Sequence, residues 1–458
     1  MKKSYKKILG LIFSVILMVG LSACTSNSGQ KDQESQVVDT KSLIDNILKS
    51  QEEAEAEKKL AEKEKTDQAK EEKSNTKKDE PKKEKTQKKL SKKENDEEKP
   101  KKKSKKDIKT VKIKAFGDIM SHMGQTAYAR NKAGGDAFDF SDQFLYMKDF
   151  ISDADIAIGN YETTSNPDYE LSGYPRFNTD VSYPKYIKEA GFDIVTTANN
   201  HSLDTGEEGL FSTIKAIEDA GLFHVGTQGE NEDRIVYMTV NDVKIAFLAY
   251  TYGVNGLESS VVNYDVNKVV NFLDEELIEK DIKVAKNNNA DFVVVYPHWG
   301  IEYQSYPSPD QISLGRKMID WGADLVIGNH PHVVQPGEYY ETEDGRKGFI
   351  AYALGNYISL QSYESLGDIR TEQSVAYEID LSKDMSDGET KLEDVRAYPL
   401  WVGTTYNEYG GNTQTRLVAD FLGDGKYADQ ADEFQKERMK QAQDMVSETV
   451  RTDVEYRK

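Results

Sequence analysis

Cysteine is almost absent from this 458-residue sequence, which contains only Cys24. No disulfide can therefore form within the chain, although exported proteins often rely on them. Long apolar runs are also missing, since no run reaches the roughly 20 residues that a membrane-spanning helix needs. A basic excess is lacking too, because the formal net charge is −20. This charge argues against nucleic acid as a partner, because phosphate backbones require a basic face.

The one clear apolar run lies at the N-terminus, from Ile8 to about Leu21, behind four lysines. A basic start, an apolar core of this length and a small-residue exit are typical of a signal peptide, which we place at residues 1–23. The following Leu-Ser-Ala-Cys sequence matches the bacterial lipobox, whose cysteine is acylated and becomes the new N-terminus. We therefore expect a lipoprotein anchored through Cys24 to the extracytoplasmic face of the cell membrane. The alternative is an ordinary secreted protein with a stray cysteine.

Residues 24–109 consist largely of Lys, Glu, Gln, Ser and Asp. Such a segment cannot bury enough apolar area to offset its conformational entropy, so we predict a disordered tether whose ends lie roughly 50 Å apart. Residues 1–110 carry a net charge of about +8, which leaves about −28 for the remainder. The basic tether is either a solvated spacer or a contact for anionic membrane or wall polymers. The acidic remainder should repel a polyanion except at a local cationic or metal site.

From Val111 onward the sequence repeats an apolar strand, a loop rich in Gly, Asn, Asp or His, and a helix-like stretch. The predicted strands begin at Val111, Asp155, Asp193, Val243, Asp291 and Asp324, and the predicted helices span Gly209–Ala220, Asn267–Asn287 and Gln311–Trp321. This alternation indicates a layered α/β domain. Three later segments contain strands without helices between them and are candidates for the second sheet of a sandwich: Gly348–Leu354, Ser374–Leu381 and Lys391–Val402. A charged helix or tail is expected over 428–458.

Five of the six histidines follow these strands, and only His224 stands apart. The five are His122, His201, His298, His330 and His332. Ligands collect at the carboxyl ends of strands in open α/β sheets, so these histidines should meet Asp118, Glu162 and Asn200 at one edge. Imidazole, carboxylate and amide ligands suit Mn, Fe or Zn, and two such ions can bridge a water and polarise a phosphoryl oxygen. Taken singly, each residue also fits a helix cap, a turn or a packed core position. Their ordered recurrence favours one shared site.

Six motifs in order resemble the CapA, or poly-γ-glutamate capsule synthesis, family. They are Phe116–Met120, Gly159–Glu162, Ala198–Asp204, His298–Tyr303, Gly328–Gln335 and Ala353–Tyr357. The resemblance defines a domain over 110–382 and leaves 383–427 as a strand-rich extension. That family is similar to calcineurin-like metallophosphatases. The resemblance therefore implies an α/β fold in which two sheets form an α/β/β/α sandwich with a dinuclear metal site.

The same resemblance assigns roles by motif position. It places Asp118 and His332 on one ion, Asn200, His298 and His330 on the other, and Glu162 in the bridging place, with Asn160 as a second candidate. His201 would be a general acid or transition-state stabiliser, assisted by Asp204, while Glu302 would face the substrate. The acidity of the folded part, rather than the resemblance, limits polymer contact to the metals or to local cations such as Arg176 and Lys185. Met120 stands where phosphatases have a histidine, and His122 lies two residues further on. The expected cofactor is therefore one or two divalent ions.

Three functions stay open at this point. The first is a surface lipoprotein of capsule or poly-γ-glutamate biosynthesis, which assembles, exports or anchors an anionic polymer beside membrane subunits of the synthase and has metal-dependent hydrolase chemistry. The second is an extracytoplasmic metallophosphoesterase that acts on a small phosphorylated substrate. The third is a non-catalytic, metal-stabilised scaffold or binding protein. Met120 weakens the second function relative to the other two.

Overall fold

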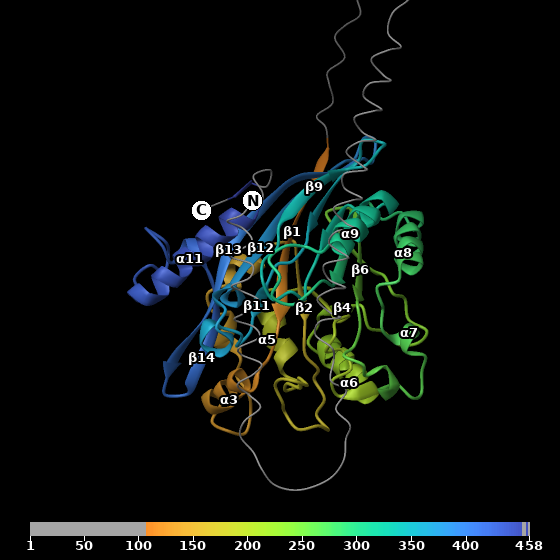
Figure 1. The fold of residues 1–458 in the computed structure, drawn as a ribbon. Coiled ribbons are helices and arrows are strands. Elements are labelled where there is room, and N and C mark those ends of the chain that lie inside the picture. The colour runs from red at the N-terminus through yellow and green to blue at the C-terminus, as the bar shows by residue number, and fades with distance from the viewer. Residues whose placement is uncertain (1–106, 451–454, 457–458) are drawn as a thin grey trace, which may run out of the picture. The chain divides into compact units, whose positions relative to one another are not determined.

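The computed structural model describes residues 107–450 and 455–456, so the signal peptide, Cys24 and nearly all of the tether lie outside the described residues. Two sheets make up its centre (Figure 1). The larger contains β1 (Ile108–Ile119), β2 (Ile156–Tyr161), β3 (Ile194–Thr196), β4 (Phe223–Val225), β11 (Asn356–Ile358), β12 (Gln373–Asp384), β13 (Thr390–Asn407), β14 (Gly410–Leu417) and β15 (Glu455–Tyr456). The smaller contains β5 (Val236–Val240), β6 (Val243–Thr251), β7 (Phe292–His298), β8 (Leu325–Ile327), β9 (Gly337–Glu341) and β10 (Lys347–Ala351).

Helices cover the two sheets. They are α3 (Met123–Lys132), α4 (Lys148–Ser152), α5 (Tyr183–Glu189), α6 (Gly206–Asp219), α7 (Val266–Val269), α8 (Glu275–Asn287), α9 (Pro309–Trp321), α10 (Tyr363–Leu366) and α11 (Glu433–Thr449). Four 3₁₀ turns add η1 (Ser141–Phe144), η2 (Glu258–Ser260), η3 (Ile369–Glu372) and η4 (Val418–Asp420). Within the described ranges, every helix is too short or too polar to cross a lipid bilayer.

Three apolar layers hold these elements together. The central layer lies between the sheets, where Ile113 of β1 and Ile158 of β2 share a cluster with Phe247 of β6 and Val294 of β7. A second cluster joins the outer face of the larger sheet to α3, α4, α5 and α6, and a third joins the smaller sheet to α8 and α9. The order helix, sheet, sheet, helix confirms the predicted α/β/β/α sandwich.

The helix predicted over Asn267–Asn287 is wrong over residues 270–274, which separate α7 from α8. Between α7 and α8 the chain is extended, and its residues Val270 and Phe272 form β-bridges with Thr227 and Thr251. Pairing with neighbouring backbone overrides the helical periodicity of this short stretch. Helix α8 begins where Asp274 accepts a hydrogen bond from the backbone N–H of Leu277, which is an N-cap contact.

The prediction that the late strands form the second sheet is also wrong. Only β10, from the segment Gly348–Leu354, lies in the smaller sheet, where it runs parallel to β8. By contrast, β12 and β13 extend the larger sheet, with β12 antiparallel to β1. Alternating apolar residues predict a strand, but they do not predict the strand with which it pairs. The partner here depends on pairings between residues more than 250 positions apart, such as Ile113 with Ile379.

The carboxyl ends of the parallel strands gather at one edge of the sandwich. In the larger sheet β1, β2 and β3 run parallel, and in the smaller sheet β6, β7 and β8 do so. Strand β11 then pairs with β1 so that Asn356 lies opposite Asp118. A Cβ atom on Gly117 would lie 1.8 Å from the carbonyl oxygen of Gly355, so only glycine allows this approach. The close pairing fixes the position of Asp118.

Candidate metal centre

Five predicted ligands come together at this edge. Asp118 lies near the end of β1, Glu162 follows β2, His298 ends β7, and His330 and His332 lie on the loop after β8. Each side chain is at most 4% exposed. Burying carboxylates together is costly without a compensating positive charge. The arrangement therefore favours a bound cation.

Two groups of ligand atoms meet at Glu162. The first is Glu162, His298 and His330, and the second is Asp118, Glu162 and His332; within each group the atoms lie within 4.8 Å of one another. The Glu162 Oε1 atom lies 3.6 Å from His298 Nε2 and 4.0 Å from His332 Nε2. Glu162 therefore occupies the position between the two groups that a bridging ligand requires.

Two asparagines complete the surroundings of the groups. The Asn200 Oδ1 atom lies 2.8 Å from His298 Nε2, which places Asn200 beside the first group. Asn160, the alternative bridging candidate, instead donates a hydrogen bond of 2.8 Å to Asp118. Sequence reasoning assigned no role to Asn356, whose Oδ1 atom lies 2.9 Å from His332 Nδ1. Its place in the last of the six motifs was the available signal.

The first motif departs from a phosphatase site as the sequence suggested. Met120 is 1% exposed and belongs to the apolar core. The His122 Nε2 atom lies 3.0 Å from Ser359 Oγ, and the His122 ring packs edge-on against Phe177. His122 belongs to neither ligand group. Among the described residues, the His and carboxylate ligands of the second group are consequently Asp118, Glu162 and His332.

Unpaired atoms test whether this site fits a metal ion. The buried atoms Glu162 Oε1 and His330 Nδ1 have no hydrogen-bond partner among the described residues. Leaving such an atom unpaired costs about 1–3 kcal/mol. A divalent cation would contact both kinds of atom, and mixed nitrogen and oxygen ligands suit Mn, Fe or Zn. Three protein ligands in a group leave room for water, as catalytic sites require.

Protonation states in the site agree with this fit. Burial, followed by the charge of Asp118, raises the pKa of Glu162 well above its usual range. Burial also lowers the pKa of His298 well below its usual range and that of His330 to about 3. The two histidines are therefore neutral at physiological pH, with nitrogen lone pairs available to a metal. A cation between Glu162 and Asp118 would relieve the repulsion of their carboxylates.

Backbone strain is concentrated on the loop that supplies the histidines. His330 has a φ of 100° and His332 a φ of 58°, and the neighbouring Tyr303 has a φ of 63°. Non-glycine residues adopt positive φ rarely, at a cost of about 1–3 kcal/mol each. The fold therefore holds both imidazoles in one unfavourable but defined orientation.

His201 and Asp204 form a pair at the mouth of the centre. His201 Nδ1 lies 2.7 Å from Asp204 Oδ2, which also accepts a hydrogen bond from the backbone N–H of Phe177. This contact fixes the imidazole and leaves its Nε2 atom for a substrate. A pocket of about 280 Å³ is lined by both residues and by the predicted substrate residues Arg176 and Glu302. The structure thus brings all four together.

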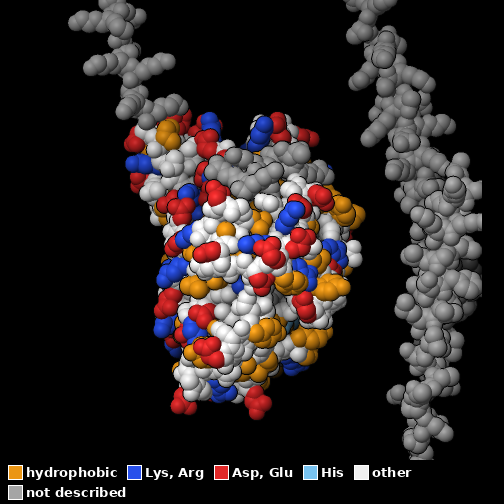
Figure 2. All heavy atoms as spheres, turned by 90° about the vertical axis from the view of Figure 1, so that its left-hand side faces the viewer, with side chains coloured by type: hydrophobic (Ala, Val, Ile, Leu, Met, Phe, Trp, Pro, Cys, Tyr) orange, Lys and Arg blue, Asp and Glu red, His pale blue; other side chains and the backbone are white. Residues whose placement is uncertain are grey.

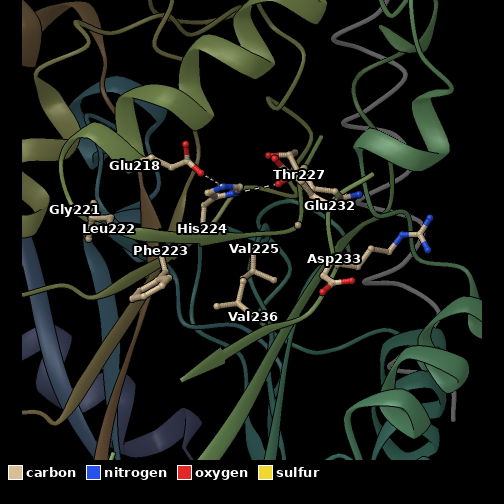
Figure 3. Close-up of a pocket in the computed structure, with 13 residues that line it drawn as sticks. Glu218, Gly221, Leu222, Phe223, His224, Val225, Thr227, Glu232, Asp233 and Val236 are labelled. Carbon is tan, nitrogen blue, oxygen red and sulfur yellow. Dashed lines mark hydrogen bonds and ion pairs between the residues drawn. The ribbon is translucent and has the colours of Figure 1, made fainter. Parts of the chain in front are cut away.

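The sixth histidine lies elsewhere, as the sequence indicated. His224 belongs to β4, and Figure 3 shows it in a separate pocket of about 430 Å³ between Glu218 and Thr227. Its Nδ1 atom lies 3.0 Å from the Thr227 carbonyl oxygen, and its Nε2 atom lies 3.5 Å from Glu218. His224 is therefore a suitable control residue for experiments on the centre.

The buried histidines predict that the metal-free protein loses stability as the pH falls. Burial lowers the pKa of His122 from 6.5 to about 4, so below pH 6.5 the unfolded chain takes up a proton that the folded chain refuses. The contribution of neutral His122 to the free energy of unfolding is therefore complete above pH 6.5 and is lost progressively as the pH falls towards 4. Between pH 7.5 and 5 the loss should be about 2 kcal/mol for this histidine. Urea unfolding of apo protein at both pH values measures it.

In His122→Asn the free energy of unfolding should fall by about 2 kcal/mol less between pH 7.5 and pH 5 than in the natural chain. In the control His224→Asn it should fall as much as in the natural chain. Equal drops in the natural chain and in His122→Asn would contradict the prediction.

Comparison with known proteins identifies chains with similar sequences. Residues 112–361, more than half of the chain, match the family model described as bacterial capsule synthesis protein PGA_cap. The capsule biosynthesis protein CapA of Bacillus anthracis is 33% identical over 237 residues, 49% of this chain and 55% of that protein. The PGA biosynthesis protein CapA of Bacillus subtilis (strain 168) is 31% identical over 290 residues, 60% of this chain and 71% of that protein. The chain thus spans just over half the length of the first relative.

Among solved structures, the calcineurin-like phosphoesterase YfkN from Bacillus subtilis aligns with 74% of this chain and 97% of that chain, at 15% identity and a TM-score of 0.39.

Proposed function

Because this chain belongs to the PGA_cap family of bacterial capsule synthesis proteins, we propose that it acts in capsule biosynthesis as a metal-dependent hydrolase at the outer face of the cell membrane. The observation that carries the proposal is the shared Glu162, which stands between two ligand groups beside the His201–Asp204 pair. A divalent ion held there would polarise the scissile group and lower the pKa of an attacking water. The ion is Mn, Fe or Zn, with one or two bound.

The residues of this chain supply the remaining steps. His201, held through Nδ1 by Asp204, presents Nε2 to the leaving group and donates a proton to it as the bond breaks. Arg176 lies exposed at the same mouth and is the local cation that an anionic polymer needs on an otherwise acidic domain. Glu302, which lines the same pocket, orients polar groups of the substrate. Substrate therefore binds at the rim and reacts beside Glu162.

The proposed location depends on the N-terminal sequence. The Leu-Ser-Ala-Cys motif at Cys24 supports a lipid anchor, and the charged segment 24–109 supports a tether between the anchor and the folded domain. The chain would work beside the membrane subunits of a capsule or poly-γ-glutamate synthase, where the polymer emerges. Radiolabelled palmitate incorporation that is lost in Cys24→Ala tests this part.

One observation favours a second candidate, a non-catalytic metal-stabilised scaffold. Met120 is buried in the core and His122 is bonded to Ser359, so the second ligand group lacks a histidine that phosphatases have. Such a scaffold would need the metal for folding but would not need His201. The two candidates consequently differ in the effect of a His201 substitution that preserves metal binding.

The deciding experiment compares His201→Gln with a deletion of the gene. We expect the manganese-loaded full chain to hydrolyse bis(p-nitrophenyl) phosphate, and His201→Gln to lower kcat about 10²- to 10⁴-fold while metal content stays the same. We also expect both the deletion strain and the His201→Gln strain to lose capsule polymer. Normal capsule in the His201→Gln strain, with capsule lost in the deletion strain, would reject the hydrolase and favour the scaffold.

A further inference from the structure

A groove of about 750 Å³ lies on the side of the domain that carries β13 and the start of α11. Its walls are β13 from Trp401 to Tyr406, the segment 359–365 after β11, and the first turn of α11 around Phe434. Figure 2 views the domain from that side, where apolar side chains interrupt the charged surface. A volume of this size is within the range of about 300–1,000 Å³ of ligand sites. Most of these residues lie beyond the 112–361 match, so the groove is not defined by the family model.

Aromatic rings without an apolar cover lie along this groove. The Tyr406 side chain is 84% exposed and that of Phe434 is 61% exposed, whereas Trp401 is buried at 3%. Burying large rings removes apolar area from water, which is favourable, so rings left in water along a groove indicate a ligand with apolar faces. Trp401 Nε1 donates a hydrogen bond of 3.1 Å to Glu372, and this contact fixes two of the side chains that line the groove.

Charges around the groove exclude a polyanion as its ligand. Three acidic residues line it, Glu364, Glu372 and Asp432, and the lining residues that the structure describes include no Lys or Arg. The adjacent Arg438 is already paired, at 3.1 Å from Glu364 and 3.8 Å from Glu372. Its guanidinium also covers one face of the Phe434 ring. An anionic chain would therefore meet three acidic side chains and no free cation among the described lining residues.

Hydrogen-bonding groups in the groove suit hydroxyl groups. Side-chain oxygens of Ser359, Ser362, Thr404 and Thr405 belong to its lining residues, and a hydroxyl both donates and accepts. Asp432 is held in place because it accepts a hydrogen bond of 2.8 Å from the Gln435 backbone N–H. A groove lined by carboxylates, hydroxyls and aromatic rings matches a ligand that alternates apolar C–H faces with hydroxyl groups. A saccharide chain has that chemistry.

The groove begins beside the metal centre. The Ser359 Oγ atom lies 3.0 Å from His122 Nε2, and Gln361 Oε1 accepts a 3.2 Å hydrogen bond from Asn356, which contacts His332. We infer that this groove binds an uncharged oligosaccharide, with one end of the bound chain next to the metal centre. The site is separate from the pocket at Arg176 and needs no metal for its contacts.

Calorimetric titration of the full chain with chitotetraose, cellotetraose and maltotetraose tests the inference. We expect at least one of these uncharged tetrasaccharides to bind with a Kd below about 1 mM, and Tyr406→Ala and Phe434→Ala each to weaken that binding about tenfold or more. The matched control is Phe223→Ala, since Phe223 is 52% exposed at β4, the opposite edge of the same sheet. The control should bind as tightly as the natural chain.

Three results would overturn the inference. The first is that none of the three sugars binds, and the second is that both groove variants keep the natural affinity. Poly-γ-glutamate fragments that bind the natural chain but not Phe434→Ala would also overturn it, because the groove would then accept a polyanion. Metal content is measured on the same samples. The groove variants should keep the metal of the natural chain, so a failure of sugar binding can be distinguished from a failure of the proposed metal-dependent function.

Discussion

Replacing Glu162 with glutamine should weaken the binding of divalent metal by about 100-fold or more, a larger effect than any other single substitution in the centre. The loss of an outer partner of a metal ligand already costs about 10- to 100-fold in affinity, and Glu162 is a member of both ligand groups. The amide keeps the size of the side chain but removes its charge and one of its two acceptor oxygens. Elemental analysis after dialysis against a fixed concentration of free Mn²⁺ gives the measurement.

Variants of a single group sharpen this test. His330→Ala and His298→Ala should each lower the metal bound by the first group, and Asp118→Asn should lower the metal bound by the second. Glu162→Gln should lower both. Glu302→Gln, at the exposed rim, is the matched control and should retain the metal of the natural chain.

Stability separates metal loss from unfolding. Burial and Asp118 raise the pKa of Glu162, which means that its charged form is unfavourable in the metal-free fold. Glutamine removes that penalty, so metal-free Glu162→Gln should be at least as stable as the metal-free natural chain. Unchanged metal content in Glu162→Gln would show that Glu162 is not the shared ligand. Unfolding of the apo variant would contradict the stability expectation.

Local patterns in the sequence predicted much of the fold. Helix α6 and helix α9 lie within three residues of their predicted starts, and β6 matches its apolar run. Each depends on contacts close in sequence. By contrast, the sheet to which β12 and β13 belong was predicted wrongly, because it depends on pairing between Tyr377 and Ala115 across more than 200 residues. Alternation of side chains contains no information about that partner.

The site was predictable for a related reason. Asp118, Glu162 and His298 each follow an apolar strand, and parallel strands direct their carboxyl ends to one edge. The resemblance placed Glu162 between the two ligand groups, with Asn160 as a second candidate, and Glu162 is the residue that both groups share. The sequence could not predict that Asn356 rather than His122 would lie beside His332. The groove at Tyr406 was missed entirely, since it combines segments that have no shared motif.

A buried lysine on β1 should have the largest effect on stability outside the metal centre. Lys114 is 1% exposed, and its Nζ atom lies 3.2 Å from Glu378 and donates a 2.6 Å hydrogen bond to the Phe150 carbonyl. Lys114→Met should destabilise the protein by about 3 kcal/mol, because it leaves Glu378 buried with one partner fewer. Lys112→Met is the matched control. Lys112 is on the same strand, its side chain is 31% exposed, and its ion pair with Asp153 should contribute less than about 1 kcal/mol.

The large loss of stability expected in Lys114→Met comes from its partner, Glu378. Burial alone would raise the pKa of Glu378, but hydrogen bonds from Arg396 and the charge of Lys114 hold it below its usual value. The contribution of Glu378 is therefore present above pH 4.5 and is lost as the pH falls further. Without Lys114 the pKa of Glu378 should rise, so the acid unfolding of Lys114→Met should begin at a higher pH. Acid titration followed by circular dichroism locates both midpoints.

A double variant distinguishes an uncompensated charge from lost packing. In Lys114→Met/Glu378→Gln neither buried charge of the pair remains, so most of the stability lost in Lys114→Met should return. Arg396 keeps its ion pairs with Asp380 and Asp394 in this background. If the double variant is instead as unstable as the sum of the two single variants, Lys114 and Glu378 are not coupled, and Lys114 contributes through its other contacts, the Phe150 carbonyl and the Phe150 ring below its ammonium group.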